Sequence, residues 1–167
     1  LSATEAFRVP NGGWAASTHC AFVEIDPETG AIAIDRYLVV EDCGTLVNPA
    51  VVDGQITGGV MQGIAGVLYE KLQYDADGQL VTSSFADYLV PSAADLPPIE
   101  IEHLEFEPLH EVNSRGVGEG GMIGAPAALC NAVSDALAHL GIEVDEQHLP
   151  PARVREMLLS AAARPRS

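Results

Sequence analysis

The sequence predicts an α+β fold, with a mixed or antiparallel sheet and helices packed against it. Two segments of alternating apolar residues, 19–25 and 31–40, are separated by a turn and predict a β-hairpin. Apolar residues at helical spacing predict helices over 49–70, 126–140 and 150–163. Strands interleave with helices through hairpins, and this order is typical of α+β proteins.

The predicted hairpin starts the ordered part of the chain. Ala21, Val23 and Ile25 lie on one face of its first strand, and the turn over 26–30 places Pro and Gly where a loop of four or five residues needs them. The second strand ends at Glu41-Asp42-Cys43-Gly44. Asn48-Pro49 then has the residue types that begin a helix.

The helix over 49–70 contains an unusual number of glycines. Each interior glycine costs up to ~1 kcal/mol relative to alanine, so five of them require a reason. Gln55, Gly59, Gln62 and Gly66 follow at i, i+4, i+7 and i+11 and form one stripe beside the apolar face. This stripe would let a polar ligand approach closely. The alternative is close packing against a sheet or another helix, with the glutamines in solvent.

The second half of the chain alternates between short strands and loops. A second hairpin is predicted around the Asp-Gly turn at 77–78, and 99–106 is predicted to be a strand. The segment 108–121 is expected to be irregular. For the helix over 126–140, Pro126 lies near the first turn and Gly141 follows its end. We expect one domain over 1–167, with 1–15 and 164–167 peripheral, and the start at Leu1 suggests a piece of a longer polypeptide.

Composition excludes several classes of function. With 8 basic and 24 acidic residues the net charge is −16, which argues against binding nucleic acid or an anionic membrane surface. No apolar run approaches the ~20 residues of a membrane span. Three scattered cysteines exclude a complete disulfide framework and favour a reducing, cytoplasmic location. The histidines and cysteines lack the spacing of metal ligands, so no protein-ligated metal is expected.

The run Gly116-Val117-Gly118-Glu119-Gly120-Gly121 is the strongest candidate for chemistry. Glycine leaves space for a bulky ligand beside the backbone, and a glutamate ahead of a helix is placed to move a proton. The alternative is an acidic residue on a flexible surface turn. The run also satisfies G-x-G-x-x-G, but no buried strand precedes it and Glu119 would repel a pyrophosphate, which disfavours a dinucleotide site.

Taken together, several motifs resemble those of the molybdenum hydroxylases, the family of xanthine dehydrogenase, aldehyde oxidase and aerobic carbon monoxide dehydrogenase. The resemblance covers about residues 16–140 and rests on the order of its parts: Val23-Glu24-Ile25-Asp26, Asp42-Cys43-Gly44, Asn48-Pro49, Gly54-Gln55, Gly58-Gly59, Gln62-Gly63, Glu70, Gly116-Val117-Gly118-Glu119 and Asn131-Ala132-Val133. It identifies the chain as similar to the C-terminal part of the molybdopterin-binding large subunit.

The resemblance implies a cofactor, partners and a reaction. The cofactor would be molybdopterin with molybdenum, often as the cytosine dinucleotide in bacteria, held by its dithiolene and shared with upstream segments of the large subunit. Iron–sulfur and FAD groups would lie on partner subunits or domains of a hetero-oligomer. The reaction would hydroxylate or oxidise a small carbonyl or heteroaromatic substrate, with water as the source of oxygen.

The resemblance also assigns roles to individual residues. By motif position Glu119 would be the general base that takes a proton from the Mo–OH group, and Gln55 would contact the pterin. Val117 and Gly118 would pass beside the metal centre, and Gln62 would share the cofactor-facing side of the helix. A base of this kind is expected to be buried, because desolvation raises the pKa of a carboxyl group. The isolated chain is expected to be inactive, and the alternative is a structural or assembly module that has lost the cofactor.

Overall fold

The computed structural model describes residues 1–6, 13–108 and 113–163. In these ranges three strands form one sheet, in the order β1 (Ala16–Ile25), β2 (Ile32–Asp42) and β3 (Ile99–His103). The helices are α1 (Pro49–Leu68), α2 (Gly120–Leu137) and α3 (Pro151–Ala162), with short 3₁₀ turns η1 (Ala93–Asp95) and η2 (Ala138–Leu140). β1 pairs with β2 antiparallel and β2 pairs with β3 parallel, which confirms the α+β class with a mixed sheet.

The predicted first hairpin is present, with longer strands than expected. A bulge between Phe22 and Val23 leaves Asp35 of β2 without a partner in the β1 ladder. In the turn the Asp26 carbonyl accepts the Gly30 N–H at 2.8 Å. Gly30 has a φ of +76°, a conformation that favours glycine, and its backbone lies directly against Pro151 at the start of α3. The hairpin turn therefore also docks the last helix.

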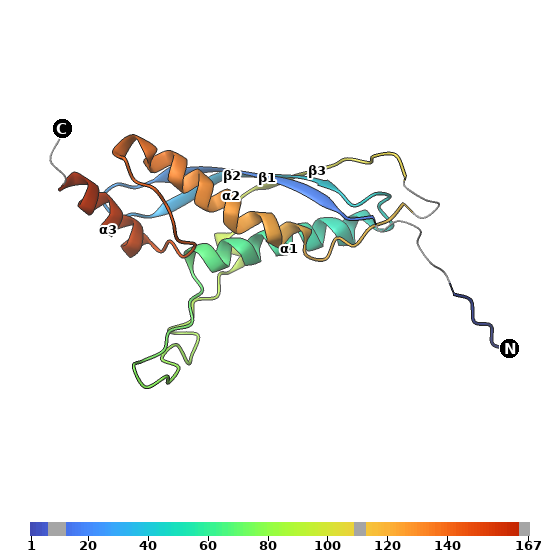
Figure 1. Cartoon of the computed structure of the whole chain (residues 1–167), viewed down its shortest axis with the longest axis horizontal. Coiled ribbons are helices and arrows are strands. Elements are labelled where there is room, and N and C mark those ends of the chain that lie inside the picture. Colours follow the sequence, from blue (N-terminus) through green and yellow to red (C-terminus); the bar gives the residue numbers. More distant parts are fainter. Residues whose placement is uncertain (7–12, 109–112, 164–167) are drawn as a thin grey trace.

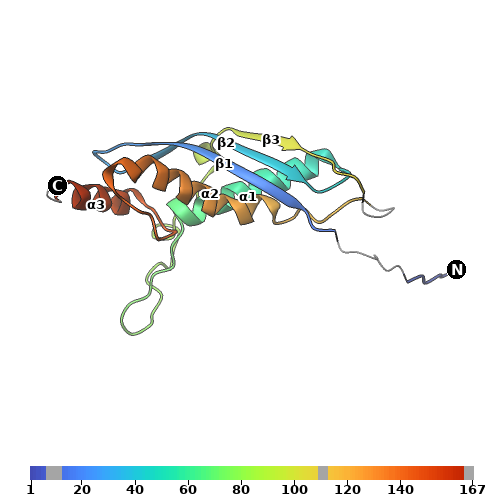
Figure 2. The ribbon, with the colours of Figure 1, turned by 45° about the horizontal axis from the view of Figure 1, so that its top comes forward.

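Helices α1 and α2 lie side by side against one face of the sheet (Figure 1; Figure 2). The α1 helix begins as predicted, because the Asn48 side chain accepts the Val51 N–H at 3.3 Å and caps the first turn. The fully buried core joins β2, α1, α2 and the chain around α3 through Tyr37, Val39, Ile56, Val60, Ile64, Val67, Leu129, Val133, Leu149 and Val154.

The glycines of α1 have two different environments. A Cβ placed on Gly59 would lie only 2.8 Å from the Met122 backbone nitrogen, and a Cβ on Gly63 would lie 2.5 Å from the Ala125 Cβ. The two helices therefore cross with almost no side chain between them. Close helix packing, the alternative that the sequence left open, accounts for Gly59. A Cβ on Gly58, in contrast, would have nothing within 4 Å.

Two predicted boundaries are wrong. The α2 helix begins at Gly120 rather than at Pro126, because the Glu119 carbonyl already accepts the N–H groups of Met122 and Ile123. Packing of its first turn on α1 overrides the weak helix propensity of the glycines and retains Pro126 inside the helix. The strand predicted over 99–106 ends at His103. His103 pairs with Glu41, and β2 ends at the next residue, Asp42, so no further partner is available.

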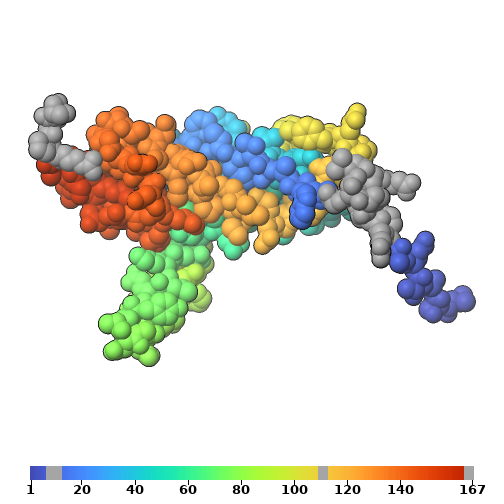
Figure 3. All heavy atoms as spheres, in the orientation of Figure 1, coloured from blue at the N-terminus to red at the C-terminus, as the bar shows by residue number. Residues whose placement is uncertain are grey.

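The chain that follows α1 projects away from the body of the molecule (Figure 1; Figure 3) and is back at the sheet by Pro98, whose carbonyl accepts the Tyr37 N–H at 3.1 Å. The predicted second hairpin is present as a chain reversal with a single bridge between Tyr74 and Leu80, without assigned strands. Asp75 stabilises the turn by accepting the N–H groups of Asp77 and Gln79, each at 2.9 Å. The single-domain boundaries stay a prediction. The tail at 164–167, and parts of the terminal 1–15 and of the irregular 108–121, lie outside the described residues.

The adjacent glycines of α1 allow a matched test of the helix contact. We expect Gly59→Ala to destabilise the chain by about 1–3 kcal/mol, since its methyl group would press on the α2 backbone. Gly58→Ala should instead stabilise it by up to about 1 kcal/mol through helix propensity. Thermal unfolding of both variants checks this, and a shift in the same direction for both would contradict the packing described.

Candidate functional site

Glu119 lies at the N-cap position of α2, where the glycine-rich loop enters the helix. Its side chain makes no capping hydrogen bond and is exposed. The carboxylate is therefore presented outward, beside a helix N-terminus. The burial expected for this side chain is not provided by the described part of the chain.

The structure brings the loop together with one of the two predicted glutamines. The Gln55 amide nitrogen lies 3.8 Å from the place where a Cβ on Gly118 would be. Val117 is partly buried and packs against the hydrophobic core. Gln62 is exposed on the same helix, seven residues beyond Gln55 and so about 10 Å further along the axis. Glu119, Gly118 and Gln55 thus form one exposed region, with Gln62 further along α1.

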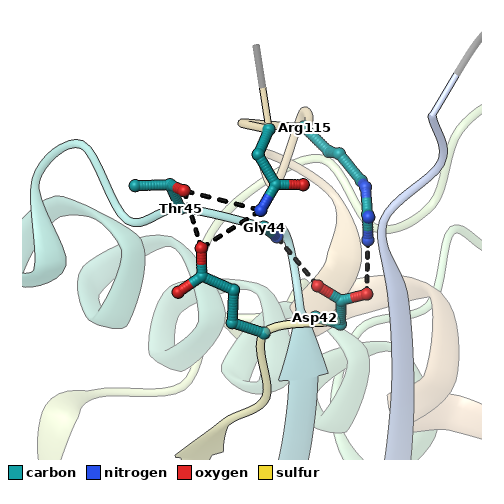
Figure 4. A network of polar contacts seen from close by, with 6 residues as sticks. Asp42, Gly44, Thr45 and Arg115 are labelled. Atoms are coloured by element: carbon teal, nitrogen blue, oxygen red, sulfur yellow. Dashed lines mark hydrogen bonds and ion pairs between the residues drawn. The ribbon is translucent and has the colours of Figure 1, made fainter. Parts of the chain in front are cut away.

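A buried ion pair holds the loop where it leaves the sheet. The Asp42 carboxylate, at the end of β2, accepts a short hydrogen bond from the Arg115 guanidinium, and these side chains are 7% and 9% exposed (Figure 4). The other Asp42 oxygen accepts the Gly44 N–H at 2.9 Å. The Arg115 N–H donates to the Cys43 carbonyl at 2.8 Å. Side chain and backbone therefore both tie this end of the loop to β2.

A second polar group supports the same junction from the chain after β3. The Glu105 carboxylate accepts the Thr45 hydroxyl at 2.7 Å and the Asn113 amide at 3.1 Å (Figure 4). Gly44 has a φ of +70° and lies directly against the Asn113 carbonyl, where a side chain would not fit. A recess of about 300 Å³ adjoins this junction, lined in part by Val51 and Val117.

The helix end of the loop is held by β1. The His19 ring nitrogens lie 3.0 Å from the Tyr37 hydroxyl and 3.2 Å from the Gly120 carbonyl oxygen. The Ser17 hydroxyl also approaches that carbonyl, at 3.4 Å. Burial lowers the pKa of His19, and the hydrogen bond to Gly120 only partly opposes this. Hydrogen bonds to the sheet thus hold the chain at Arg115, before Glu119, and at Gly120, directly after it.

The buried carboxylate near the loop is Glu41, which the sequence analysis did not single out. Its side chain is 1% exposed and neither oxygen has a hydrogen-bond partner among the described residues. Both oxygens lie about 3 Å from the place where a Cβ on Gly120 would be. Burial raises the pKa of Glu41. The signal was present in the sequence, because Glu41 follows Tyr37 and Val39 at the period of two that defines the buried face of a strand.

Two further properties bear on the kind of site. Within the described ranges, no three His, Cys, Asp or Glu side chains form a group that could hold a metal ion. The expectation that protein side chains do not ligate the metal stays a prediction. None of the helices among the described residues combines the length and apolar character that crossing a membrane requires.

Comparison with known proteins decides the family. Residues 1–97 match the family model described as molybdopterin cofactor-binding domain. The chain belongs to this family. The predicted resemblance to the molybdenum hydroxylases, as the C-terminal part of their large subunit, is therefore confirmed.

Relatives of this molybdopterin-binding domain act in several enzymes. It is 45% identical over 145 residues to the nicotine 6-hydroxylase large subunit of Paenarthrobacter nicotinovorans, with 86% of this chain and 17% of the relative covered. Identity to the carbon monoxide dehydrogenase large chain of Hydrogenophaga pseudoflava is 33% over 143 residues, with 85% and 18% covered. The chain thus spans less than a fifth of the length of these relatives.

Solved structures agree with the fold described above. The crystal structure of quinoline 2-oxidoreductase from Pseudomonas putida 86 matches with a TM-score of 0.83 at 45% identity, covering 90% of this chain and 19% of that one. Carbon monoxide dehydrogenase from Oligotropha carboxidovorans matches with a TM-score of 0.86 at 28% identity, covering 92% and 19%. The arrangement of sheet and helices is therefore shared with large subunits of molybdenum enzymes.

The buried Glu41 carboxyl predicts a specific pH dependence of stability. Its raised pKa means that the folded chain binds more protons than the unfolded chain above about pH 4, so stability falls as pH rises through the folded-state pKa. Glu41→Gln removes this loss. The unfolding temperature of the variant should therefore increase relative to the wild type as pH rises, and a difference that is constant with pH would count against a buried, titrating Glu41.

The Asp42–Arg115 pair predicts a large effect of removing one charge. Asp42→Asn leaves the Arg115 guanidinium buried without its partner and should cost about 3–5 kcal/mol of unfolding free energy. The control is Glu100→Gln in the exposed pair with Arg36, which should cost less than about 1 kcal/mol. Chemical denaturation compares the two variants, and equal costs would show that burial of the first pair does not matter.

Proposed function

We propose that this chain is the part of a molybdenum hydroxylase that presents its catalytic base, Glu119, to a molybdopterin cofactor. The observation that carries the proposal is the exposed carboxylate at the start of α2, next to Gly118 and the Gln55 amide, in a member of the molybdopterin-binding family. In a longer polypeptide, other segments and the cofactor would cover this region. Covering Glu119 would supply the desolvation that a base working near neutrality needs.

The residues present fit such a cofactor. A Cβ on Gly116 would meet nothing within 4 Å, and the position of a Cβ on Gly118 is open except for Gln55, so a bulky group can lie against this backbone. The exposed Gln55 amide offers a donor and an acceptor for a pterin ring, and Gln62 extends the same face of α1. Val117, packed on the core, would hold the loop in place for the cofactor.

Bound molybdopterin would supply the two-electron redox chemistry, with water as the source of oxygen. With the cofactor bound, Glu119 would take up a proton during the reaction and Gln55 would hold the pterin. The cytosine dinucleotide form of the cofactor, and electron transfer to iron–sulfur and FAD groups on partners, belong to the same proposal. The relative named as the gamma subunit of a 6-hydroxypseudooxynicotine dehydrogenase complex, 39% identical over 134 residues, supports assembly with other subunits.

The substrate class follows from the pattern of similarity. Identity is 45% to enzymes named for nicotine and quinoline, and 27–33% to those named for carbon monoxide. Nicotine and quinoline both contain a ring nitrogen that makes the adjacent carbon electrophilic. We therefore favour a nitrogen-containing heteroaromatic substrate that is hydroxylated on the ring. The competing function, a structural module without cofactor, would leave the open glycine backbone and the outward Glu119 without a role.

Glu119→Gln tests the proposal in the intact enzyme that contains this chain. Loss of the base should lower turnover of a heteroaromatic substrate by at least about 100-fold, while the molybdenum content measured by metal analysis stays normal. Glu143→Gln, on an exposed residue after α2, is the matched control and should change neither quantity. Near-normal turnover of Glu119→Gln would remove Glu119 from the mechanism. A wild-type complex without molybdenum would support the structural module instead.

A further inference from the structure

The side chain of His19, on β1, is closely packed against the start of α2. Its ring packs against Gly124, where an added Cβ would lie 2.8 Å from the ring Cγ and could not be accommodated. The ring also meets Tyr37 edge to face, with centroids 5.8 Å apart and planes at 79°. Helix, strand and tyrosine therefore fix the position of the imidazole before any hydrogen bond is considered.

The hydrogen bonds of His19 determine which nitrogen carries the proton. A carbonyl oxygen can only accept, so the bond of 3.2 Å to Gly120 requires a hydrogen on Nε2. In the neutral imidazole Nδ1 then accepts, and the Tyr37 hydroxyl, 3.0 Å away and on a fully buried side chain, donates to it. Protonation of Nδ1 would replace this acceptor with a second donor. Burial lowers the pKa of His19 in the same direction, towards the neutral form.

The carbonyl that His19 binds belongs to the residue next to the proposed base. Glu119 is the N-cap of α2 and Gly120 its first residue, so the bond to the Gly120 carbonyl holds the first peptide of the helix, one residue beyond the Glu119 Cα. On the other side of Glu119 the loop is open at Gly116 and Gly118, and its charged attachment is at Arg115. Among the side-chain hydrogen bonds of the described residues, those from His19 and Ser17 to Gly120 thus lie next to Glu119 in the sequence.

We propose that His19, itself oriented by Tyr37, is a positioning residue for Glu119 that acts through the Gly120 carbonyl. The inference rests on the function proposed above. The exposed Ser17 hydroxyl supports the same arrangement, since it lies 3.3 Å from His19 Nε2 and donates to the Gly120 carbonyl at 3.4 Å. The Glu41 carboxylate also packs against Gly120 but forms no hydrogen bond with it. Glu41 therefore limits the room around Gly120 without fixing the orientation of its carbonyl. His19 contacts Ser17, Tyr37, Gly120 and Gly124, so the proposal gives it no role in proton transfer.

The test compares His19→Leu with His19→Gln in the intact molybdenum enzyme. Leucine has similar bulk without a donor, whereas the glutamine amide nitrogen can replace Nε2 and donate to Gly120. For His19→Leu we expect kcat per molybdenum to fall at least about tenfold with KM unchanged, since small misplacements of a catalytic group are costly. His19→Gln should recover most of kcat. Tyr37→Phe, which keeps the ring but frees Nδ1, should lie between them.

Hydrogen exchange provides a readout that is independent of turnover. Backbone amides over 117–124 should exchange faster in His19→Leu than in the wild type, and near the wild-type rate in His19→Gln. The matched control is His139, whose Nδ1 also binds a backbone carbonyl, that of Ala136 near the far end of α2, at 2.9 Å. His139→Leu should leave both kcat and the exchange of 117–124 unchanged.

The outcomes separate this inference from the proposed function. Faster exchange in His19→Leu with unchanged kcat per molybdenum overturns the positioning role, and so does an equal loss of kcat in His19→Leu and His19→Gln. If His19→Leu does not load molybdenum, the comparison of His19→Gln with Tyr37→Phe tests the positioning role. The role then requires that His19→Gln lose less kcat than Tyr37→Phe. The Glu119→Gln variant in the same assay tests the base itself. If this variant retains turnover, the proposed function is contradicted, even when hydrogen exchange over 117–124 changes in the His19 variants as expected.

Discussion

The backbone contact between α1 and α2 is the constraint on which the rest of the structure depends. Gly59 faces the α2 backbone and Gly63 faces the small Ala125 side chain, so the first turn of α2 lies directly on the middle of α1. This contact sets where α2 starts, and the start of α2 sets where Glu119 is presented. The same approach brings Gly118 to the Gln55 amide. The glycines that weaken α1 as an isolated helix are therefore the residues that assemble the candidate site.

Buried polar groups then hold the loop between the sheet and α2. Two consecutive residues at the end of β2 contact opposite ends of the loop. Asp42 pairs with Arg115 where the loop begins, and Glu41 packs against Gly120 where α2 begins. A buried pair contributes more to geometry than to net stability, because its attraction is offset by the desolvation of both charges. This arrangement suits a loop that must keep one carboxylate in place while most of its residues are glycine.

Much of the fold could be predicted from the sequence, because its signals are local. The alternation around Val23, the Pro-Gly turn before Ile32 and the Asn48-Pro49 start of α1 each depend on neighbouring residues, and all three are confirmed. The start of α2 was predicted too late because Pro126 is a local helix-start signal, whereas the turns before it are stabilised by contact with α1. Glu41 escaped notice because strand periodicity predicts which face is buried, but not that a helix end covers it.

The sequence by itself predicted the family, an α+β fold and Glu119 as the candidate carboxylate, because these depend on residue types in a fixed order. Only the tertiary structure decided which glycines pack and which stay open, which carboxylates are buried, and that His19 on the first strand bonds to Gly120 a hundred residues later. Those properties depend on contacts between distant segments, and no spacing along the chain encodes the crossing of two helices over a sheet.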